Sequence, residues 1–270
     1  MVTDAPDHGG HITDVATLLE LDQLERDIFR GHNARHGDPS GPLYGGQVAA
    51  QALRAAGLTV ADDRLPHSLH GYFLRAGRRD QPVVYLVDRD RDGRSFSARH
   101  VRAVQNGEVI FSMLASFTTE QTGEEYEVPA TRPAGAPEDH PVGGWDALVE
   151  TREVTLSDAW HDPLSDLLWV RIPAPFPDDP ALQACGLTYL SDFGSGFAML
   201  RRPGLPVTGP SIDHVLWFHR PIRVDDWVLI DLRPVRVSGA RGSYLGTLRS
   251  RDGDLGAVVG QEMLLRGARP

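Results

Sequence analysis

The sequence contains no lysine, and all 27 of its basic residues are arginine. This absence excludes Schiff-base chemistry on a lysine amine and the phosphate-binding lysine of a P-loop. Cys185 is the single cysteine, so no disulfide can form within the chain. No apolar run approaches the roughly 18 to 20 residues that a membrane-spanning helix needs, and the first residues lack the pattern of a signal peptide. We therefore expect no membrane insertion and a location in the reducing cytoplasm.

Positive charge is also scarce, because the formal net charge is −10. Nucleic-acid binding needs a strongly basic surface, so nucleic acid is not expected as a partner. Eight arginines nevertheless gather between Arg75 and Arg102. Such a cluster suits an anionic small ligand, but four interleaved aspartates fit a self-neutralised, solvated face equally well. Both interpretations stay open.

The first half of the chain predicts two helices followed by strands. The first dozen residues read as disordered, and Thr13 or Asp14 can cap an amphipathic helix that ends at Gly31. A second helix is predicted over 47–57, closed by Gly57. Strands are predicted over 68–77, 81–93 and a hairpin flanking Asn106-Gly107, which is a strong hairpin signal.

The second half repeats this plan. Residues 121–145 are dense in proline, glycine and acid, which is typical of a linker. A helix follows over 178–192, capped by Asp178 or Asp179 with Pro180 in its first turn. Two strands, 211–221 and 226–238, and a hairpin across Asp252-Gly253 come next. One helix followed by an antiparallel sheet, twice, predicts two related α+β halves.

Two polar residues stand where apolar ones are expected. Strand alternation makes Gln261 the only polar side chain in an apolar stripe of the last strand. Asp192 continues the buried line of Cys185 and Tyr189 along the second-half helix. Burying an amide without partners costs roughly 1 to 3 kcal/mol, so Gln261 needs a hydrogen-bonding neighbour. A helix end in solvent for Asp192 and a backbone partner for Gln261 remain the plain structural alternative.

The stretch SIDHVLWFHRP, residues 211–221, contains a serine, an aspartate and two histidines, which are the residue types of a catalytic triad. Alternation along a strand predicts that Ser211 and Asp213 share one face and that His214 lies on the other. The G-x-S-x-G nucleophile motif of α/β-hydrolases is missing as well. The role of Ser211 must therefore depend on residues elsewhere in the chain.

A series of short motifs gives the chain a resemblance to a known family. They are FRG (29–31), YGGQVAAQAL (44–53), HSLHGYFLRAG (67–77), RDGRSFSARHVRAVQNGE (91–108), IDHVLWFHRP (212–221), SGARG (238–242) and QE (261–262). In this order they resemble acyl-CoA thioesterase II, the double-hotdog thioesterases. The resemblance implies an α+β fold of two hotdogs in one chain, each a sheet wrapped around a long helix. It also implies hydrolysis of medium- to long-chain fatty acyl-CoA without metal or cofactor.

The family's catalytic residues fall on three positions of this sequence. The resemblance implies that Asp192, Ser211 and Gln261 hold the attacking water, and that Asp213, His214 and His219 are structural. The expected units are an N-terminal hotdog (1–122, residues 1–12 disordered), a linker (123–145) and a C-terminal hotdog with the catalytic residues (146–270). We expect a homodimer or homotetramer.

Two further sets of residues are candidates for substrate contacts. Gly45, Gly46 and Gln47 open a helix whose N–H groups suit an oxyanion, although these glycines fit tight packing equally well. Arg94 and Arg99 are candidates for binding CoA. No cluster has metal-ligand spacing, so we expect no metal. Two other hotdog functions stay open: a non-catalytic acyl-CoA-binding module, and a hydratase or dehydratase.

Overall fold

The computed structural model describes residues 12–34, 41–130, 132–143, 147–154, 166–194 and 207–266. Residues 1–11, most of the segment expected to be disordered, lie outside these ranges. The helices are α1 (Val15–Leu18), α2 (Gly45–Gly57) and α3 (Pro180–Leu190), with a 3₁₀ turn, η1 (Pro137–Asp139). The strands are β1 (Leu21–Glu25), β2 (Ile28–Gly31), β3 (Leu65–Phe73), β4 (Val83–Asp92), β5 (Phe96–Gln105), β6 (Glu108–Thr118), β7 (Val142–Gly143), β8 (Glu150–Glu153), β9 (Asp166–Arg171), β10 (Val207–Ser211), β11 (Asp213–Phe218), β12 (Val228–Ser238), β13 (Arg241–Ser250) and β14 (Leu255–Arg266).

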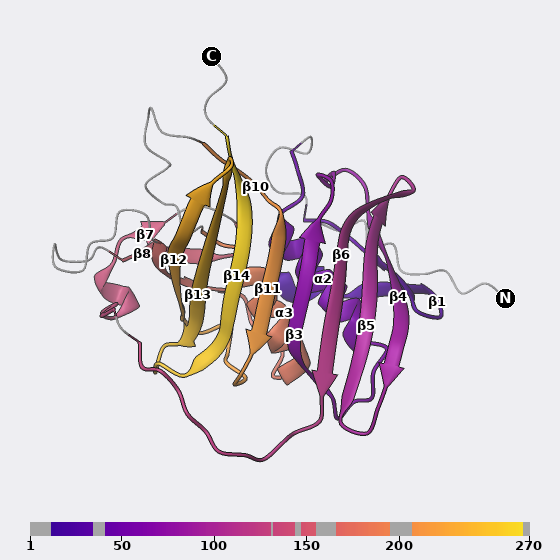
Figure 1. Cartoon of the computed structure of the whole chain (residues 1–270), viewed down its shortest axis with the longest axis horizontal. Helices are drawn as coiled ribbons and strands as arrows, with labels where there is room; N and C mark the ends of the chain where they lie inside the picture. The colour runs from indigo at the N-terminus through magenta and orange to yellow at the C-terminus, as the bar shows by residue number, and fades with distance from the viewer. Residues whose placement is uncertain are drawn as a thin grey trace.

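The strands form one continuous antiparallel sheet that curves around the helices (Figure 1). Their order is β1-β2-β4-β5-β6-β3-β11-β14-β13-β12-β9-β8-β7, and β10 also pairs with β14. The two halves meet where β3 pairs with β11, from Asp213 opposite Tyr72 to Trp217 opposite Ser68. Hydrogen bonds of the sheet therefore run unbroken from one half into the other.

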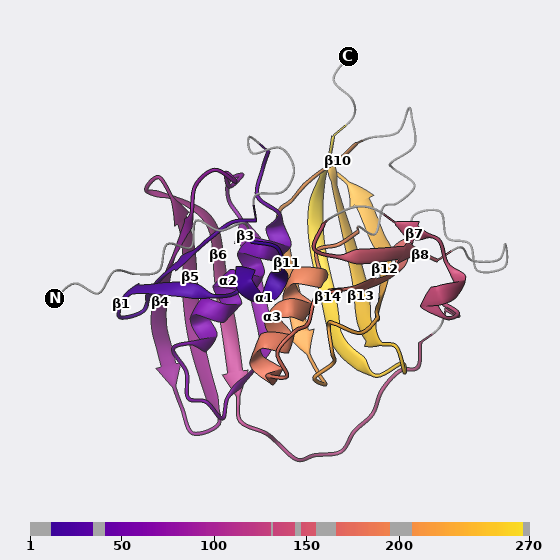
Figure 2. The ribbon, with the colours of Figure 1, turned by 180° about the vertical axis from the view of Figure 1, so that it is seen from behind.

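Helices α2 and α3 lie side by side on the inner face of the sheet (Figure 2). Alanines and glycines dominate α2, and ten of its thirteen residues are buried. Small side chains let a helix approach its neighbours closely: a Cβ at Gly46 would lie only 2.5 Å from the Tyr189 carbonyl oxygen of α3. The C-terminal end of α3 is thereby held against the N-terminal end of α2, and this contact positions the candidate site.

Two of the local signals predicted from the sequence are present in the structure. Asp179 caps α3 by accepting a hydrogen bond of 2.9 Å from the Ala181 N–H, and Pro180 is its first residue. The β5–β6 turn places Asn106 and Gly107 at φ of 50° and 77°, as a tight hairpin turn requires. These predictions are confirmed.

The amphipathic helix predicted up to Gly31 is wrong. Asp14 does cap a helix, but α1 ends at Leu18, and the rest forms the β1–β2 hairpin. Asp27 adopts a φ of 61° in the turn, a conformation that no α-helix contains. Pairing of β2 with the edge of β4 outweighs the modest helix propensity of this leucine- and glutamate-rich segment.

The segment predicted as a linker runs along the rim of the sheet after β6 (Figure 1). It is not free of structure, because residues 123–145 contain η1 and β7. β7 pairs with β8 at the far edge of the second-half strands. The chain thus crosses from the end of β6 to the opposite edge of the sheet before it builds the second half.

Candidate active site

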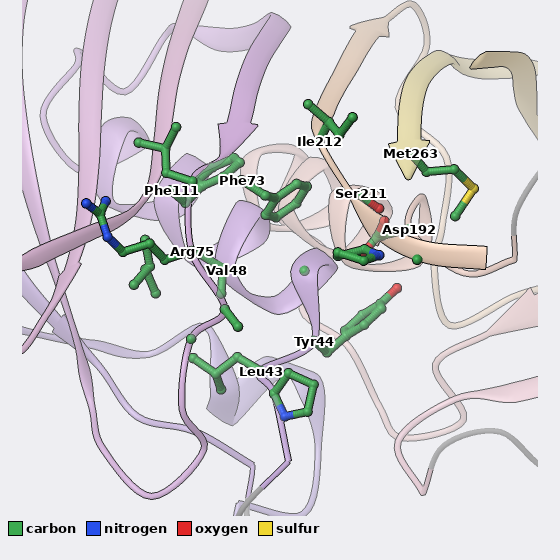
Figure 3. Close-up of a pocket in the computed structure, with 18 of the residues that line it drawn as sticks. Leu43, Tyr44, Val48, Phe73, Arg75, Phe111, Asp192, Ser211, Ile212 and Met263 are labelled. Carbon is green, nitrogen blue, oxygen red and sulfur yellow. The ribbon is translucent and has the colours of Figure 1, made fainter. Parts of the chain in front are cut away.

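A cavity of about 690 Å³ opens where the two halves meet. It lies between the N-terminus of α2, the loop after β3, the segment after α3, and strands β6, β10 and β14. All three residues predicted to be catalytic, Asp192, Ser211 and Gln261, line this cavity. Figure 3 shows Asp192 and Ser211 next to each other, with Phe73 from the first half facing them. Both halves therefore contribute walls to one site.

The side-chain amide of Gln261 joins the other two residues. Its Nε2 donates a hydrogen bond of 3.3 Å to Asp192 Oδ1 and a second one to Ser211 Oγ. Gln261 is buried on β14, in the apolar stripe that the sequence indicated. The buried amide of Gln261 therefore has side chains of the site as its hydrogen-bond partners. Its Nε2 group needs no backbone partner.

Asp192 sits two residues beyond the end of α3, against the start of α2. The Gly46 N–H donates a hydrogen bond to its carboxylate, and a Cβ at Gly45 would lie 2.7 Å from Asp192 Oδ2. Burial raises the pKa of the Asp192 carboxyl, while His214, Gln261 and Gly46 oppose this shift. The alternative of a helix end in solvent is therefore not supported, because this carboxylate is part-buried and has polar partners.

His214 lies in the same network, so the prediction that it faces away from Ser211 is wrong. Its Nδ1 contacts Gln261 Oε1, and its Nε2 lies 2.8 Å from Ser191 Oγ. Simple alternation fails because Ile212 separates β10 from β11, and the two strands pair with β14 in registers that differ by one residue: Ser211 lies opposite Met263, and Val215 lies opposite Gly260. The Asp213 carboxylate accepts the Glu262 N–H there. This irregularity brings two side chains three residues apart onto one face of the sheet.

The three residues suggested for the oxyanion have different environments. Gly45 lines the cavity. The Gly46 N–H is used by Asp192, and close packing against the Tyr189 carbonyl requires a glycine at this position. Gln47 is buried and donates a hydrogen bond of 2.8 Å to Asn33 Oδ1. The structure supports a substrate contact only for Gly45 among these three.

The two arginines suggested for CoA do not line the cavity. Arg99 is 1 % exposed, and its guanidinium binds Asp92, Thr59 and backbone carbonyls. It is a buried structural residue, so the structure does not support a contact with CoA phosphates. Arg94 is exposed in the β4–β5 turn and is not among the lining residues. Arg75 and Arg79, in the loop after β3, do line the cavity.

Cys185 lies inside α3 and is 3 % exposed. Burial raises the pKa of its thiol to about 12, so almost none of it is a nucleophilic thiolate at neutral pH. We expect Cys185→Ala to retain kcat within about twofold and to lower the free energy of unfolding by about 1 to 2 kcal/mol through the small cavity. Steady-state kinetics and thermal unfolding measure both effects. A folded variant with background activity would show that the thiol takes part in the chemistry.

Two negative findings concern the described residues only. In these ranges, no group of three or more His, Cys, Asp or Glu side chains is arranged to hold a metal ion. None of the helices described is both long enough and apolar enough to cross a membrane.

Comparisons with known proteins agree on one family. Residues 35–118 match the acyl-CoA thioesterase N-terminal domain, and residues 127–265 match the acyl-CoA thioesterase C-terminal domain. Human acyl-coenzyme A thioesterase 8 is 33 % identical over 93 % of this chain and 88 % of its own length. Acyl-CoA thioesterase 2 of Haemophilus influenzae is 34 % identical over 92 % of this chain and 96 % of its own.

Solved structures give the same answer. An acyl-CoA thioesterase II from Mycobacterium marinum superposes with a TM-score of 0.80 at 38 % identity, covering 94 % of this chain and 98 % of that one. A hot dog protein from Alicyclobacillus acidocaldarius shares the fold, with a TM-score of 0.77 at 20 % identity over 94 % and 98 % of the chains. The helices inside the sheet are short here, with thirteen residues in α2 and eleven in α3. The chain belongs to the acyl-CoA thioesterase II family, folds as a tandem double hotdog, and is an acyl-CoA thioesterase.

Proposed function

We propose that this enzyme hydrolyses medium- to long-chain fatty acyl-CoA by direct attack of a water molecule held by Asp192, Ser211 and Gln261. One observation carries the proposal: a single amide, that of Gln261, donates to both other residues on the wall of a largely apolar cavity. Three polar groups fixed around one point can hold a water molecule in position for attack. No part of this scheme needs a covalent acyl-enzyme.

Asp192 is the general base of the reaction. It takes a proton from the water as the water oxygen bonds to the thioester carbonyl carbon. Collapse of the tetrahedral intermediate breaks the C–S bond, and the proton passes from Asp192 to the departing CoA sulfur. The raised pKa of the Asp192 carboxyl suits both steps, because it makes the carboxylate a stronger base and places its pKa closer to neutral pH.

Ser211 and Gln261 orient the water. Ser211 Oγ accepts a hydrogen bond from Gln261, so its own hydroxyl proton is available for the water. For the carbonyl oxygen, the Gly45 N–H is the best placed donor of the three residues considered, since it opens α2 beside the cavity. The first N–H groups of a helix have no partner within the helix, and the helix dipole favours negative charge there.

The apolar lining is suited to an acyl chain. Leucine, valine, isoleucine, phenylalanine and methionine side chains from both halves form most of it: Leu43, Val48, Phe73, Ile110, Phe111 and Met263. The volume of about 690 Å³ lies within the usual range for sites of small-molecule ligands. We expect acyl chains longer than acetyl to gain affinity by burying apolar surface here.

Arg75 and Arg79 would bind the CoA phosphates. Arg75 is half-exposed at the rim and donates a hydrogen bond of 2.8 Å to the Val109 carbonyl, and Glu108 pairs with its other nitrogen. Arg79 donates to the Pro42 carbonyl at 2.9 Å. Asn33 Nδ2 donates to the backbone carbonyls of Arg78 and Arg79, which holds the part of the loop that carries Arg79. Guanidinium groups are well suited to phosphate oxygens.

Replacing Arg75 and Arg79 with alanine should raise the KM for a long-chain acyl-CoA by about threefold to tenfold each, because each loses a charge-assisted contact at a partly exposed site. Arg78→Ala is the matched control, since Arg78 lies in the same loop and pairs with Asp80 but does not line the cavity. An N-acetylcysteamine thioester, which lacks the nucleotide, should show no change in KM with any variant. An equal rise for both substrates, or for Arg78→Ala, would contradict this assignment.

A panel of acyl-CoA thioesters from acetyl to stearoyl tests the proposed function. We expect release of free thiol with the highest kcat/KM on medium to long chains, unaffected by a chelator. Hydration of an enoyl-CoA, or tight binding without turnover, would favour the hydratase and binding-module alternatives instead. A preference for acetyl-CoA would overturn the proposed chain length. The cytoplasmic location, the domain boundaries and the homodimeric or homotetrameric state stay predictions.

A further inference from the structure

His214 is completely buried behind the water-holding residues, and both of its ring nitrogens have partners. The ring contacts Gln261 Oε1 through Nδ1 and Ser191 Oγ through Nε2. It does not line the cavity, so it cannot reach the substrate itself. A polar side chain in such a place acts on the reaction through its neighbours, and the water-holding residue that it contacts directly is Gln261.

The contact with His214 decides which way the Gln261 amide points. A glutamine amide can turn by half a rotation and exchange its oxygen with its nitrogen. In the observed orientation Nε2 donates to Asp192 and Ser211, and Oε1 therefore faces His214 Nδ1. Because Oε1 only accepts hydrogen bonds, His214 Nδ1 must carry a proton. The opposite orientation would place Oε1 against the Asp192 carboxylate, which is repulsive, and Nε2 against His214 Nδ1, which is repulsive as long as Nδ1 carries the proton.

Ser191 fixes the histidine ring in turn. Its Oγ lies 2.8 Å from His214 Nε2 and 2.8 Å from the Thr188 carbonyl oxygen, and both Ser191 and Thr188 are fully buried. The single hydroxyl proton serves one acceptor at a time, and a ring that carries its proton on Nδ1 accepts it at Nε2. Ser191 directly precedes Asp192 at the end of α3. The ring therefore links the helix end that carries the base to the strand that carries Gln261. A displacement of about 1 Å in such a site can cost about a hundredfold in rate.

We propose that His214 is a positioning residue: held by Ser191, it donates from Nδ1 to Gln261 and locks the amide so that Nε2 faces Asp192 and Ser211. The proposal rests on the proposed role of these three residues in holding the water. It assigns to His214 no proton transfer to or from the substrate.

Three substitutions of His214 distinguish a role in positioning Gln261 from a role in packing alone. In His214→Asn the side-chain nitrogen can occupy the place of Nδ1 and still donate to Gln261. In His214→Gln the amide extends toward Ser191 and leaves the Nδ1 position without a donor, and His214→Leu removes both contacts. We expect kcat to fall by about ten- to a hundredfold in the Gln and Leu variants and by less than about fivefold in the Asn variant. KM should change by less than about threefold in all of them.

A second arm places His214→Gln in the Gln261→Ala background. Because His214 acts through Gln261, the added loss in kcat should be less than about twofold. Circular dichroism and thermal unfolding establish that each protein is folded. If the Leu variant does not fold, the comparison of Asn with Gln still decides, since both are polar and similar in size.

The outcomes distinguish this inference from the proposed function. Near-normal kcat in folded Gln261→Ala would refute the water-holding role itself. A low kcat in Gln261→Ala together with an unimpaired His214→Gln variant would overturn only the role of His214. Equal losses in the Asn and Gln variants, or fully additive losses with Gln261→Ala, would also overturn it, because both results are those of a residue that merely fills space.

Discussion

Asp192→Asn should lower kcat by about 10² to 10⁴-fold, with little change in KM. The amide keeps the shape of the carboxylate and its Oδ1 can still accept the hydrogen bond of Gln261, but it cannot take a proton from water. This range is the usual contribution of a general base. Steady-state thiol release from a saturating long-chain acyl-CoA measures the effect. A folded variant with near-normal kcat would show that the base is another group.

The stability of the Asp192→Asn variant provides a second test of the same carboxyl group. Burial raises the pKa of the Asp192 carboxyl above its ordinary value of 3.8, so ionising this group costs more in the folded chain than in the unfolded one. Between these two pKa values the folded state binds more protons, and stability therefore falls as pH rises. Asp192→Asn should consequently unfold at a higher temperature than the wild type at neutral pH, and this advantage should vanish as pH falls below the ordinary carboxyl pKa. A lower Tm at neutral pH would contradict the proposed electrostatics.

The dependence of kcat/KM on pH in the acid range also depends on the Asp192 carboxyl. Wild-type kcat/KM should rise with pH as the Asp192 carboxyl ionises, with a midpoint above that of an ordinary aspartate. The residual activity of Asp192→Asn should lack this rise.

Gln261→Ala should lower kcat by about tenfold to a thousandfold, because it removes the amide that joins Asp192 to Ser211. Ser211→Ala deletes one hydrogen bond to the water, and a loss in the same range is expected. Because these residues act on one water molecule, their effects should be far from additive. Kinetics of the single and double variants with Asp192→Asn measure this coupling. Losses that multiply in full would mean that the three residues act independently.

Much of the fold was predictable because its signals are local. The cap at Asp179, the turn at Asn106-Gly107 and the alternation of β14 each depend on a few neighbouring residues. The segment up to Gly31 failed because its helical pattern competes with an edge of the sheet, and the pairing partner, β4, lies far along the chain. Tertiary pairing of this kind leaves no mark in the segment itself.

Part of the candidate site was predictable from the sequence, and part was not. Asp192 and Gln261 stood out as polar residues on apolar stripes, and the structure brings them together with Ser211. His214 was placed on the wrong face because the pairing register with β14 changes by one residue between Ser211 and Val215, which breaks strand alternation. On its other side, β11 pairs with β3 without any irregularity, with His214 opposite Gly71. Composition alone could not distinguish the buried Arg99 from Arg75 and Arg79 at the cavity, since only the folded chain decides which arginines face it.

The central claim, direct attack by a held water, is tested most directly by a single turnover in ¹⁸O-labelled water with enzyme in excess over acyl-CoA. The quenched reaction is split between mass spectrometry of the fatty acid and of the intact protein. Direct attack predicts one solvent oxygen in the fatty acid of the first turnover and no acyl adduct on the protein at any time point. An acyl group trapped on Ser211, or solvent oxygen found in the Asp192 carboxyl instead of the fatty acid, would contradict the account.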